Sequence, residues 1–547
     1  MPTRSVNSTM ARVLLLLLLS VISLTVDAQV SPPSGLQEAL RTRIEAVREA
    51  PAARVVRGNR LLQARAVAAF FEGRAFKPAW TGPQDPEAVL AAIRRVDEDG
   101  LTPADYHLAA IESLLAAKSK AASAEAEADL QVLLTDAVAA LVDHVRYGKV
   151  QPVTLDPRWN VDPRVGTPAL ETTLAELESA AATTGAIDAL KPNHFIYAGL
   201  KKELGRLREV AKAGGWAIVP AGPALKPGAR DPRVILIRKR LAATGELPSS
   251  APLDNQAYDK DVATAVKLFQ ERNRFTADGA IGKVTLDALN VSVASRIDQV
   301  RINLERARWV VGGLSDSFVL VNLPAFKVYF IRDKKNVWET RAQIGKQARA
   351  TPAFRADLRY LVLNPDWTVP PGILEDILAG MRKGQNPVAK KNLSILDRQG
   401  NPVDPASIDW AKASTRNFGY TLRQPPGPEN ALGRVKFIFP NEHFVFLHDT
   451  PSKEGFSADQ RTFSSGCIRV ENPLDLASVL LERDGWTRER VQGAIDAGES
   501  QTVLLKAPLP VLIVYWTVTV GAAGDLHFAR DVYNLDANVL RGLDSAG

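Results

Sequence analysis

Residues 35–210 carry a helical pattern of apolar positions. The stretch is rich in Ala, Leu, Glu and Arg, and its apolar residues recur with a spacing of three to four. Segments such as Thr81-Gly82-Pro83 and Leu155-Asp156-Pro157 predict loops between the helices. The pattern therefore predicts an N-terminal helical region, with helices over residues 61–71, 86–96, 105–117, 124–145 and 193–210.

A Pro/Gly-rich stretch, 220–232, predicts a linker and a domain boundary. The unit behind it, about 231–292, contains three short stripes of apolar residues at helical spacing. Between the second and third stripes lies the turn Asp278-Gly279-Ala280-Ile281-Gly282, which is rich in residues that tolerate positive φ. The stripes comprise Val234, Ile237 and Leu241, then Val262, Val266 and Phe269, then Leu286 and Leu289.

After an amphipathic helix that is expected to end near Trp309, the pattern changes from helical to extended. Strands are predicted over 318–323, 327–331, 358–363, 435–439, 443–447, 502–505 and 511–520, with helices over 474–481 and 488–497. Between residues 371 and 432 the strands stop; a helical pattern over 373–381 gives way to an Asn/Pro/Gly-rich stretch. Such an insert is either a lid over a site or an ordinary surface excursion.

Length, charge and cysteine content narrow the class of protein. A chain of 547 residues predicts about three or four domains. The net charge of +7 favours acidic polymers, but no Lys/Arg block or phosphate-binding loop indicates a nucleic acid or nucleotide site. The single cysteine excludes an intramolecular disulfide and zinc sites built on several cysteines.

The first 28 residues have the pattern of an export signal. Arg4 and Arg12 precede an apolar run from Val13 to Val26, followed by Asp27-Ala28. The run is short for a membrane span. We expect a cleaved secretory signal and a periplasmic protein; the alternative is an uncleaved membrane anchor.

The candidate chemistry lies in His448-Asp449-Thr450-Pro451 and Ser464-Ser465-Gly466-Cys467-Ile468-Arg469-Val470. A reactive thiol needs a base, and His448 at the end of an apolar segment can supply it. Gly466 allows a tight turn that aims backbone N–H groups at an oxyanion. In an extended segment Arg469 shares a face with Cys467. The alternative interpretation is a buried, inert cysteine.

The spacing of nineteen positions between His448 and Cys467, with Ser-Gly-Cys-Ile-Arg-Val, resembles the L,D-transpeptidase (YkuD-type) catalytic domain of bacterial cell-wall enzymes. Commoner members carry His-Gly and Ser-His-Gly-Cys. Asp449 and Ser465 stand at the Gly and His places here, as in the large multidomain branch of the family. The 231–292 unit resembles peptidoglycan-binding domains, and Gly100-Leu101-Thr102-Pro103 resembles part of the scaffold region of the large members.

The resemblance implies an α+β multidomain fold: a helical scaffold region, a three-helix peptidoglycan-binding domain and a mostly-β L,D-transpeptidase catalytic domain with a helical and loop-rich capping insert. The expected boundaries are 1–28 for the signal, 29–228 for the scaffold region, 229–292 for the binding domain and 293–310 for a connecting helix. The catalytic domain is expected over 311–507, with its insert at 371–432, and a C-terminal segment packing on the scaffold over 508–547.

The implied activity is cysteine-dependent formation of 3→3 cross-links between peptidoglycan stem peptides, through a thioester and with release of terminal D-Ala. Cys467 is the expected nucleophile and His448 the general base and acid, with Gly466, Ser465 and Arg469 supporting the site. Expected cleft residues are Trp367, Arg423 and Asn430. No metal or cofactor, no nucleic acid and no membrane contact beyond an uncleaved signal are expected, and carbapenems are expected to acylate the cysteine.

Three alternatives stay open. The same site acts as an L,D-carboxypeptidase if water resolves the thioester. A non-catalytic peptidoglycan-binding protein would keep the three-helix unit and need no nucleophile. A zinc hydrolase using His443 and His448 is disfavoured, because residues five apart on a strand point to opposite faces.

Overall fold

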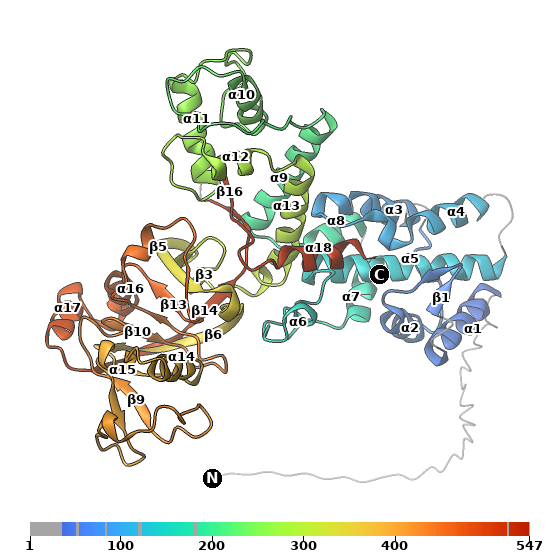
Figure 1. Ribbon diagram of the computed structural model, residues 1–547. Coiled ribbons are helices and arrows are strands. Elements are labelled where there is room, and N and C mark those ends of the chain that lie inside the picture. The colour runs from blue at the N-terminus through green and yellow to red at the C-terminus, as the bar shows by residue number, and fades with distance from the viewer. Residues whose placement is uncertain are drawn as a thin grey trace, which may run out of the picture.

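The computed structural model describes residues 35–50, 54–82, 85–118, 123–178, 183–521 and 524–545. The predicted export signal lies outside these residues. The described parts form a helical region, a three-helix unit and a sheet domain, which meet around helix α13 (Val293–Arg308) (Figure 1). The predicted α+β multidomain fold is confirmed.

The N-terminal helical region is built around α5 (Ala124–Tyr147), a helix of 24 residues that is buried on nearly every side from Ala128 to Val145. A helix that is buried on nearly every side belongs in the centre of a bundle. Around it lie α1 (Gly35–Glu49), α2 (Ala64–Gly73), α3 (Asp85–Arg95), α4 (Leu108–Lys118), α6 (Pro152–Leu155), α7 (Leu170–Glu178), α8 (Thr183–Ala189) and α9 (Phe195–Lys212), with the short strands β1 (Val55–Val56) and β2 (Asn59–Arg60).

The helix predicted over 105–117 is interrupted. Its first turn is a separate 3₁₀ helix (Pro103–Tyr106), and α4 starts only at Leu108. His107 between them has φ 56°, a left-handed conformation that a continuous right-handed helix cannot contain.

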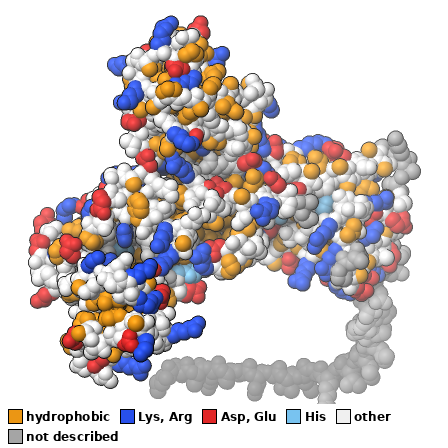
Figure 2. Space-filling view, in the orientation of Figure 1, with side chains coloured by type: hydrophobic (Ala, Val, Ile, Leu, Met, Phe, Trp, Pro, Cys, Tyr) orange, Lys and Arg blue, Asp and Glu red, His pale blue; other side chains and the backbone are white. Residues whose placement is uncertain are grey.

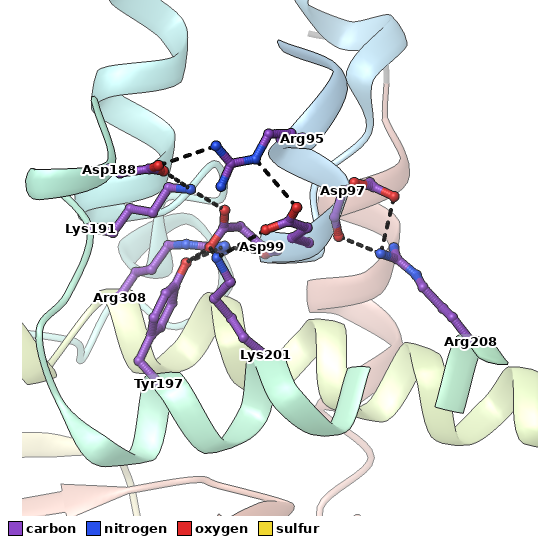
Figure 3. Close-up of polar contacts among 10 residues, drawn as sticks. Arg95, Asp97, Asp99, Asp188, Lys191, Tyr197, Lys201, Arg208 and Arg308 are labelled. Carbon is purple, nitrogen blue, oxygen red and sulfur yellow. Dashed lines mark hydrogen bonds and ion pairs between the residues drawn. The ribbon is translucent and has the colours of Figure 1, made fainter. Parts of the chain in front are cut away.

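A buried network ties the helical region to α13 (Figure 3). Asp99 accepts a hydrogen bond from Tyr197 Oη at 2.9 Å and ion pairs with Lys191 at 2.7 Å and Lys201 at 3.0 Å. Arg308 of α13 donates to Tyr197 Oη at 3.0 Å and to the Asp99 carbonyl. Burial raises the pKa of Asp99, but Lys191 and Arg308 outweigh it, so the net pKa lies below the ordinary value. The cluster fixes the helix that leads into the sheet domain.

The three-helix unit consists of α10 (Arg233–Ala243), α11 (Lys260–Arg272) and α12 (Lys283–Leu289) around its own apolar core. Asp259 caps α11 by accepting from the Val262 N–H at 3.0 Å. Gln270 organises the turn before α12: its amide donates to Asp278 at 2.8 Å and accepts from the Gly279 N–H at 2.8 Å. These contacts explain why the Phe-Gln helix and the Asp-Gly turn occur together in the sequence.

Within the described residues the sheet domain has nine paired strands in the order β12-β5-β13-β11-β10-β6-β14-β3-β4, and the pairing of β4 with β5 closes the order on itself. Helices α16 (Pro473–Leu481) and α17 (Arg488–Asp496) complete its core. The strands are β3 (Phe318–Asn322), β4 (Lys327–Arg332), β5 (Lys335–Gly345), β6 (Phe354–Leu363), β10 (Val435–Ile438), β11 (Leu447–His448), β12 (Thr462–Ser464), β13 (Ile468–Val470) and β14 (Gln501–Val514).

Two sequence predictions in this domain need correction. The strand predicted over 443–447 is reduced to Leu447–His448, because Phe444 has φ 53° and turns the chain away from extended geometry. The strand predicted over 511–520 is split between β14, which ends at Val514, and β15 (Val518–Val520). Strand β14 also continues in the sheet past the boundary expected after residue 507, since its last residues pair with both β3 and β6.

The insert forms a small body with its own core against one side of the sheet domain. It contains α14 (Pro371–Arg382), α15 (Pro387–Lys390), β8 (Ser394–Leu396) and β9 (Thr421–Gln424), which joins β7 (Trp367–Thr368) in a three-stranded sheet. After β14 the chain returns to the junction as β15, β16 (Leu526–Phe528) and α18 (Asp536–Asp544) (Figure 1). Val539 and Leu543 of α18 join the core of the helical region and α13.

Candidate functional site

Strand pairing brings His448 and the segment of Cys467 side by side. Strands β11 and β13 are parallel neighbours, with Leu447 opposite Ile468 and His448 opposite Arg469. Cys467 directly precedes β13, and its thiol lies 3.6 Å from the Phe444 carbonyl of the segment that leads into β11, so it lies beside the strand of His448. The opposite face, with Leu447 and Ile468, belongs to the apolar core. The sequence pattern thus separates a packed face from a polar one.

The polar row extends across two more strands. Lys436 of β10 lies opposite His448, and Gln343 of β5 lies opposite Arg469. The Arg469 guanidinium donates to Gln343 Oε1 at 3.1 Å, and Gln343 in turn donates to the Ser452 carbonyl at 3.2 Å. Arg469 is therefore oriented by a buried amide that is itself held in place.

His448 is buried and oriented by the main chain. Its Nδ1–H donates to the Asp449 carbonyl oxygen, which leaves Nε2 as the unprotonated nitrogen of the neutral ring. Burial, followed by the positive charge of Arg469, lowers the pKa of His448 to about 3. The Asp449 carboxylate turns away: it accepts from the Arg434 N–H at 2.8 Å and pairs with Lys453. The imidazole is thus a neutral proton acceptor around pH 7.

Cys467 ends a tight turn that begins at Ser464. The Ser464 hydroxyl donates to the Cys467 carbonyl at 2.5 Å and accepts from the Gly466 N–H at 3.1 Å. Gly466 has φ 123°, a conformation that side-chain-bearing residues rarely adopt. Its carbonyl accepts from Thr351 Oγ1 at 2.7 Å. The turn therefore requires glycine at position 466 and is fastened at both ends.

The thiol of Cys467 is half-buried and lies 3.6 Å from the Phe444 carbonyl, to which it donates. Burial raises the pKa of the Cys467 thiol; a backbone hydrogen bond with Phe446 and the charges of Lys436 and Arg469 offset part of this rise. Among the hydrogen bonds of the described residues, none joins Cys467 directly to His448. At rest the two groups are accordingly a thiol and a neutral imidazole.

Ser465 is exposed and connects the turn to the insert. Its hydroxyl accepts from Arg349 at 3.3 Å, and Arg349 pairs with Asp376 of α14 at 2.8 Å. The insert is thus linked by an ion pair to the residue two positions before the cysteine.

The three expected cleft residues occupy different environments. Trp367 is 7 % exposed and belongs to the core of the insert, so it packs the insert instead of presenting a free ring. Asn430 is buried and holds the chain before β10, donating to the Pro425 carbonyl at 2.8 Å and accepting from the Leu432 N–H at 2.9 Å. Arg423 on β9 is half exposed and pairs with Asp366. Of the three, Arg423 has the side chain most accessible to a ligand.

The structure gives contacts to residues for which the sequence interpretation had no role at the site. The side chains of Phe444 and Phe463 are 76 % and 49 % exposed. The carbonyl of Phe444 accepts from the Cys467 thiol, and Phe463 precedes Cys467 by four residues in the chain. Tyr533 of the C-terminal segment donates to the Gly345 carbonyl at 2.6 Å and accepts from the Thr351 N–H at 3.3 Å. An aromatic residue inside a turn was the available signal for Phe444, whereas no local pattern indicates Tyr533.

The described parts of the chain contain neither a cluster of side chains placed to bind a metal ion nor a helix that could cross a membrane. These parts hold no group of three or more His, Cys, Asp or Glu side chains placed to bind a metal ion. His443, the other histidine of the zinc alternative, packs edge-on against Phe354 with ring centroids 4.8 Å apart. None of the helices in the described ranges has the length and apolar character needed to cross a bilayer.

Figure 2 shows several Lys and Arg side chains on the sheet domain where it adjoins the insert.

Comparison with protein families matches residues 316–492 to the L,D-transpeptidase catalytic domain. The chain carries an L,D-transpeptidase catalytic domain. Residues 65–204 match a scaffold domain, and residues 230–289 match a family described as "Putative peptidoglycan binding domain". The polar row of β5, β13, β11 and β10 lies within the L,D-transpeptidase domain.

A curated protein of Haemophilus influenzae named "Putative L,D-transpeptidase" is 36% identical over 222 residues, which are 40% of this chain and 45% of that protein. The chain thus spans about half the length of this relative. Among solved structures, an L,D-transpeptidase from Xylanimonas cellulosilytica matches at 16% identity and a TM-score of 0.17, covering 54% of this chain and 99% of that one. The Ldtfm–avibactam carbamoyl enzyme matches at 13% identity and a TM-score of 0.18, covering 37% and 49%.

Proposed function

We propose that the protein is a cysteine-dependent L,D-transpeptidase that forms 3→3 cross-links between peptidoglycan stem peptides. The observation that carries the proposal is the placement of Cys467 beside the strand of His448, given by the parallel pairing of β11 and β13 and by the contact of the thiol with the Phe444 carbonyl. An oriented neutral imidazole beside a thiol is the arrangement that nucleophilic acyl transfer needs. The matched scaffold and peptidoglycan-binding domains support peptidoglycan as the substrate.

Acylation begins when His448 Nε2 accepts the thiol proton and Cys467 Sγ attacks the carbonyl between the third stem residue and terminal D-Ala. The tetrahedral intermediate collapses as the C–N bond breaks and His448 returns the proton to the departing D-Ala amine. A thioester remains. In the second half, the side-chain amine of a third-position residue on another stem attacks the thioester and its proton passes to His448. The C–S bond then breaks, and His448 returns the proton to the sulfur, which restores the thiol.

Backbone N–H groups of the 464–467 turn are the proposed oxyanion donors. Since the Gly466 N–H already donates to Ser464 Oγ at 3.1 Å, the Cys467 N–H is the better candidate. Losing one such donor typically costs about 10²–10³ in rate. The exposed rings of Phe444 and Phe463 offer apolar surface for the stem peptide, and Arg423 offers a cation on the insert.

Intact-protein mass spectrometry tests the nucleophile. The protein lacking residues 1–28 is incubated with a carbapenem, with Cys467→Ala as the matched control. A mass increase of one inhibitor in the wild type and none in the variant is expected. A folded wild-type protein that forms no adduct would instead favour the non-catalytic peptidoglycan-binding alternative.

Product analysis separates the remaining alternatives. Incubation with a stem tetrapeptide should release D-Ala and yield a cross-linked dimer. Release of D-Ala with only the tripeptide as the second product would assign an L,D-carboxypeptidase. Because the substrate is a cell-wall polymer, we also propose export to the periplasm through the first 28 residues.

A further inference from the structure

Two cations beside Cys467 lack a carboxylate partner. Of the charged side chains on the polar face of the described sheet, Lys436 and Arg469 make no ion pair, although the molecule pairs most of its other buried or half-buried cations. The Arg469 Nε–H is buried without a hydrogen-bond partner in the described structure. Unpaired cations in a half-buried position are costly, and such groups are retained where they meet a negative charge during function.

The position of Lys436 is set by two independent contacts. Strand register places it directly opposite His448. Its ammonium also lies 4.5 Å from the centre of the Phe446 ring, a distance typical of a cation–π contact. Phe446 is the neighbour of Cys467 across the sheet, because the Ile468 N–H donates to the Phe446 carbonyl at 2.9 Å. The ring therefore holds the ammonium on the side of the thiol.

The other charged groups around the thiol are compensated or distant. Lys453 pairs with Asp449. Arg349, which reaches Ser465, pairs with Asp376.

The remaining charged groups compensate these two cations only weakly. Burial lowers the pKa of Arg469. The charge of Cys467 raises it, and that of Glu454, in the 3₁₀ helix Glu454–Ser457, raises it to a smaller extent. His448 contributes no positive charge near neutral pH, because burial, as the main cause, lowers its pKa to about 3. The positive field at Cys467 consequently comes from Lys436 and Arg469.

We propose that Lys436 is a supporting cation of the nucleophile, which together with Arg469 stabilises the Cys467 thiolate as the proton leaves for His448. This inference rests on the proposed function of Cys467 and deepens it. The two cations lie on the strands that flank β11, one on each side of the imidazole, so the charge that develops on sulfur is met from both neighbouring strands. The burial that raises the pKa of Cys467 is the cost that these cations offset.

The test is the pH profile of Cys467 alkylation by iodoacetamide, a neutral reagent that needs no stem-peptide site. Wild type is compared with Lys436→Met, Lys436→Arg and Lys327→Met. Lys327 is a matched control, since it lies on β4 of the same sheet with its ammonium 6.0 Å from the Tyr329 ring centre and pairs with Glu339 away from the site. One nearby opposite charge shifts a pKa by about one unit or more, equivalent to about tenfold in thiolate at neutral pH.

Lys436→Met is expected to react about tenfold more slowly than wild type at neutral pH and to converge with it in strong base. Lys436→Arg and Lys327→Met are expected to keep the wild-type profile. An unchanged profile in Lys436→Met would overturn the inference, and so would a loss of rate that is equal at every pH, which would indicate a structural role. Carbapenem acylation tests the proposed function separately. If iodoacetamide alkylates the wild-type protein but the carbapenem adduct never forms, the proposed function is refuted, while the role of the two cations is not.

Discussion

Removing one hydroxyl group from the C-terminal segment should slow the chemistry at Cys467. Tyr533 is 7 % exposed, and its hydroxyl bridges the Gly345 carbonyl and the Thr351 N–H. Thr351 connects Tyr533 to the turn before Cys467, because the Thr351 hydroxyl donates to the Gly466 carbonyl at 2.7 Å. Tyr533→Phe keeps the ring and its packing while it breaks this chain of contacts.

The size of the effect can be worked out from the two hydrogen bonds that are lost. Each contributes about 0.5–1.5 kcal/mol net, and the phenylalanine ring prevents water from replacing the hydroxyl easily, so the free energy of unfolding should fall by about 1–3 kcal/mol. If about 1.4 kcal/mol of this is expressed as looser positioning of the Gly466 turn, the rate of acylation falls about tenfold. The ionisation of the thiol should not change, since no charge is removed.

The assay is the rate of carbapenem adduct formation by mass spectrometry, run beside urea unfolding and the iodoacetamide pH profile. Tyr420→Phe is the control, because Tyr420 is 38 % exposed on the insert and should change neither rate nor stability. A Tyr533→Phe protein that is destabilised but acylates at the wild-type rate would refute the reasoning, since the turn would then be held without the C-terminal segment.

Three further outcomes are expected. Gly466→Ala should cost about 1–3 kcal/mol of backbone strain at φ 123° and slow acylation at least tenfold with the circular dichroism spectrum unchanged; a wild-type rate would contradict the strain argument. Alkylation of wild-type Cys467 should keep rising with pH above 8, because burial raises the thiol pKa, and should show no step near 6.5, because the pKa of His448 is lowered to about 3; a step there would indicate an imidazolium–thiolate pair. Arg308→Met should lower the stability of the helical region by about 3–5 kcal/mol, because it removes the ion-pair partner of the fully buried Glu305. The loss should be seen as faster hydrogen exchange in α9 and α13; unchanged protection would show that the network is dispensable.

Periodicity predicted most elements of the fold, because their apolar faces are continuous in sequence. Helices α5 and α9, the three helices around Gln270 and strands β3, β4 and β6 all follow such faces. That Cys467 and His448 act together was predicted from a motif whose two ends carry distinctive neighbours, and it stays a prediction. The remaining domain boundaries and the chemical roles of the site residues stay predictions.

The features that the sequence could not indicate depend on long-range pairing and on backbone conformation. Lys436 gains its significance only from its register opposite His448, and that register depends on a turn in which Phe444 has positive φ. Trp367 was expected to line a cleft, but the insert has a core of its own that takes in the ring. Tyr533 meets Thr351 across 182 positions of the chain, a contact that no local pattern specifies.

The parallel neighbours β3 and β14 are the first and last strands, in chain order, of the nine-stranded sheet, so the chain enters and leaves the sheet domain side by side. The segment after β14 completes the helical region: Trp516 and Val539 join its core, and Lys149 donates to the carbonyls of Leu543 and Ser545. The catalytic domain is therefore, in topological terms, an insertion into the helical body. During synthesis or export the core of the helical body cannot close before the residues after β14 are available, and a chain cut short after β14 would carry Cys467 and His448 on an incompletely folded support.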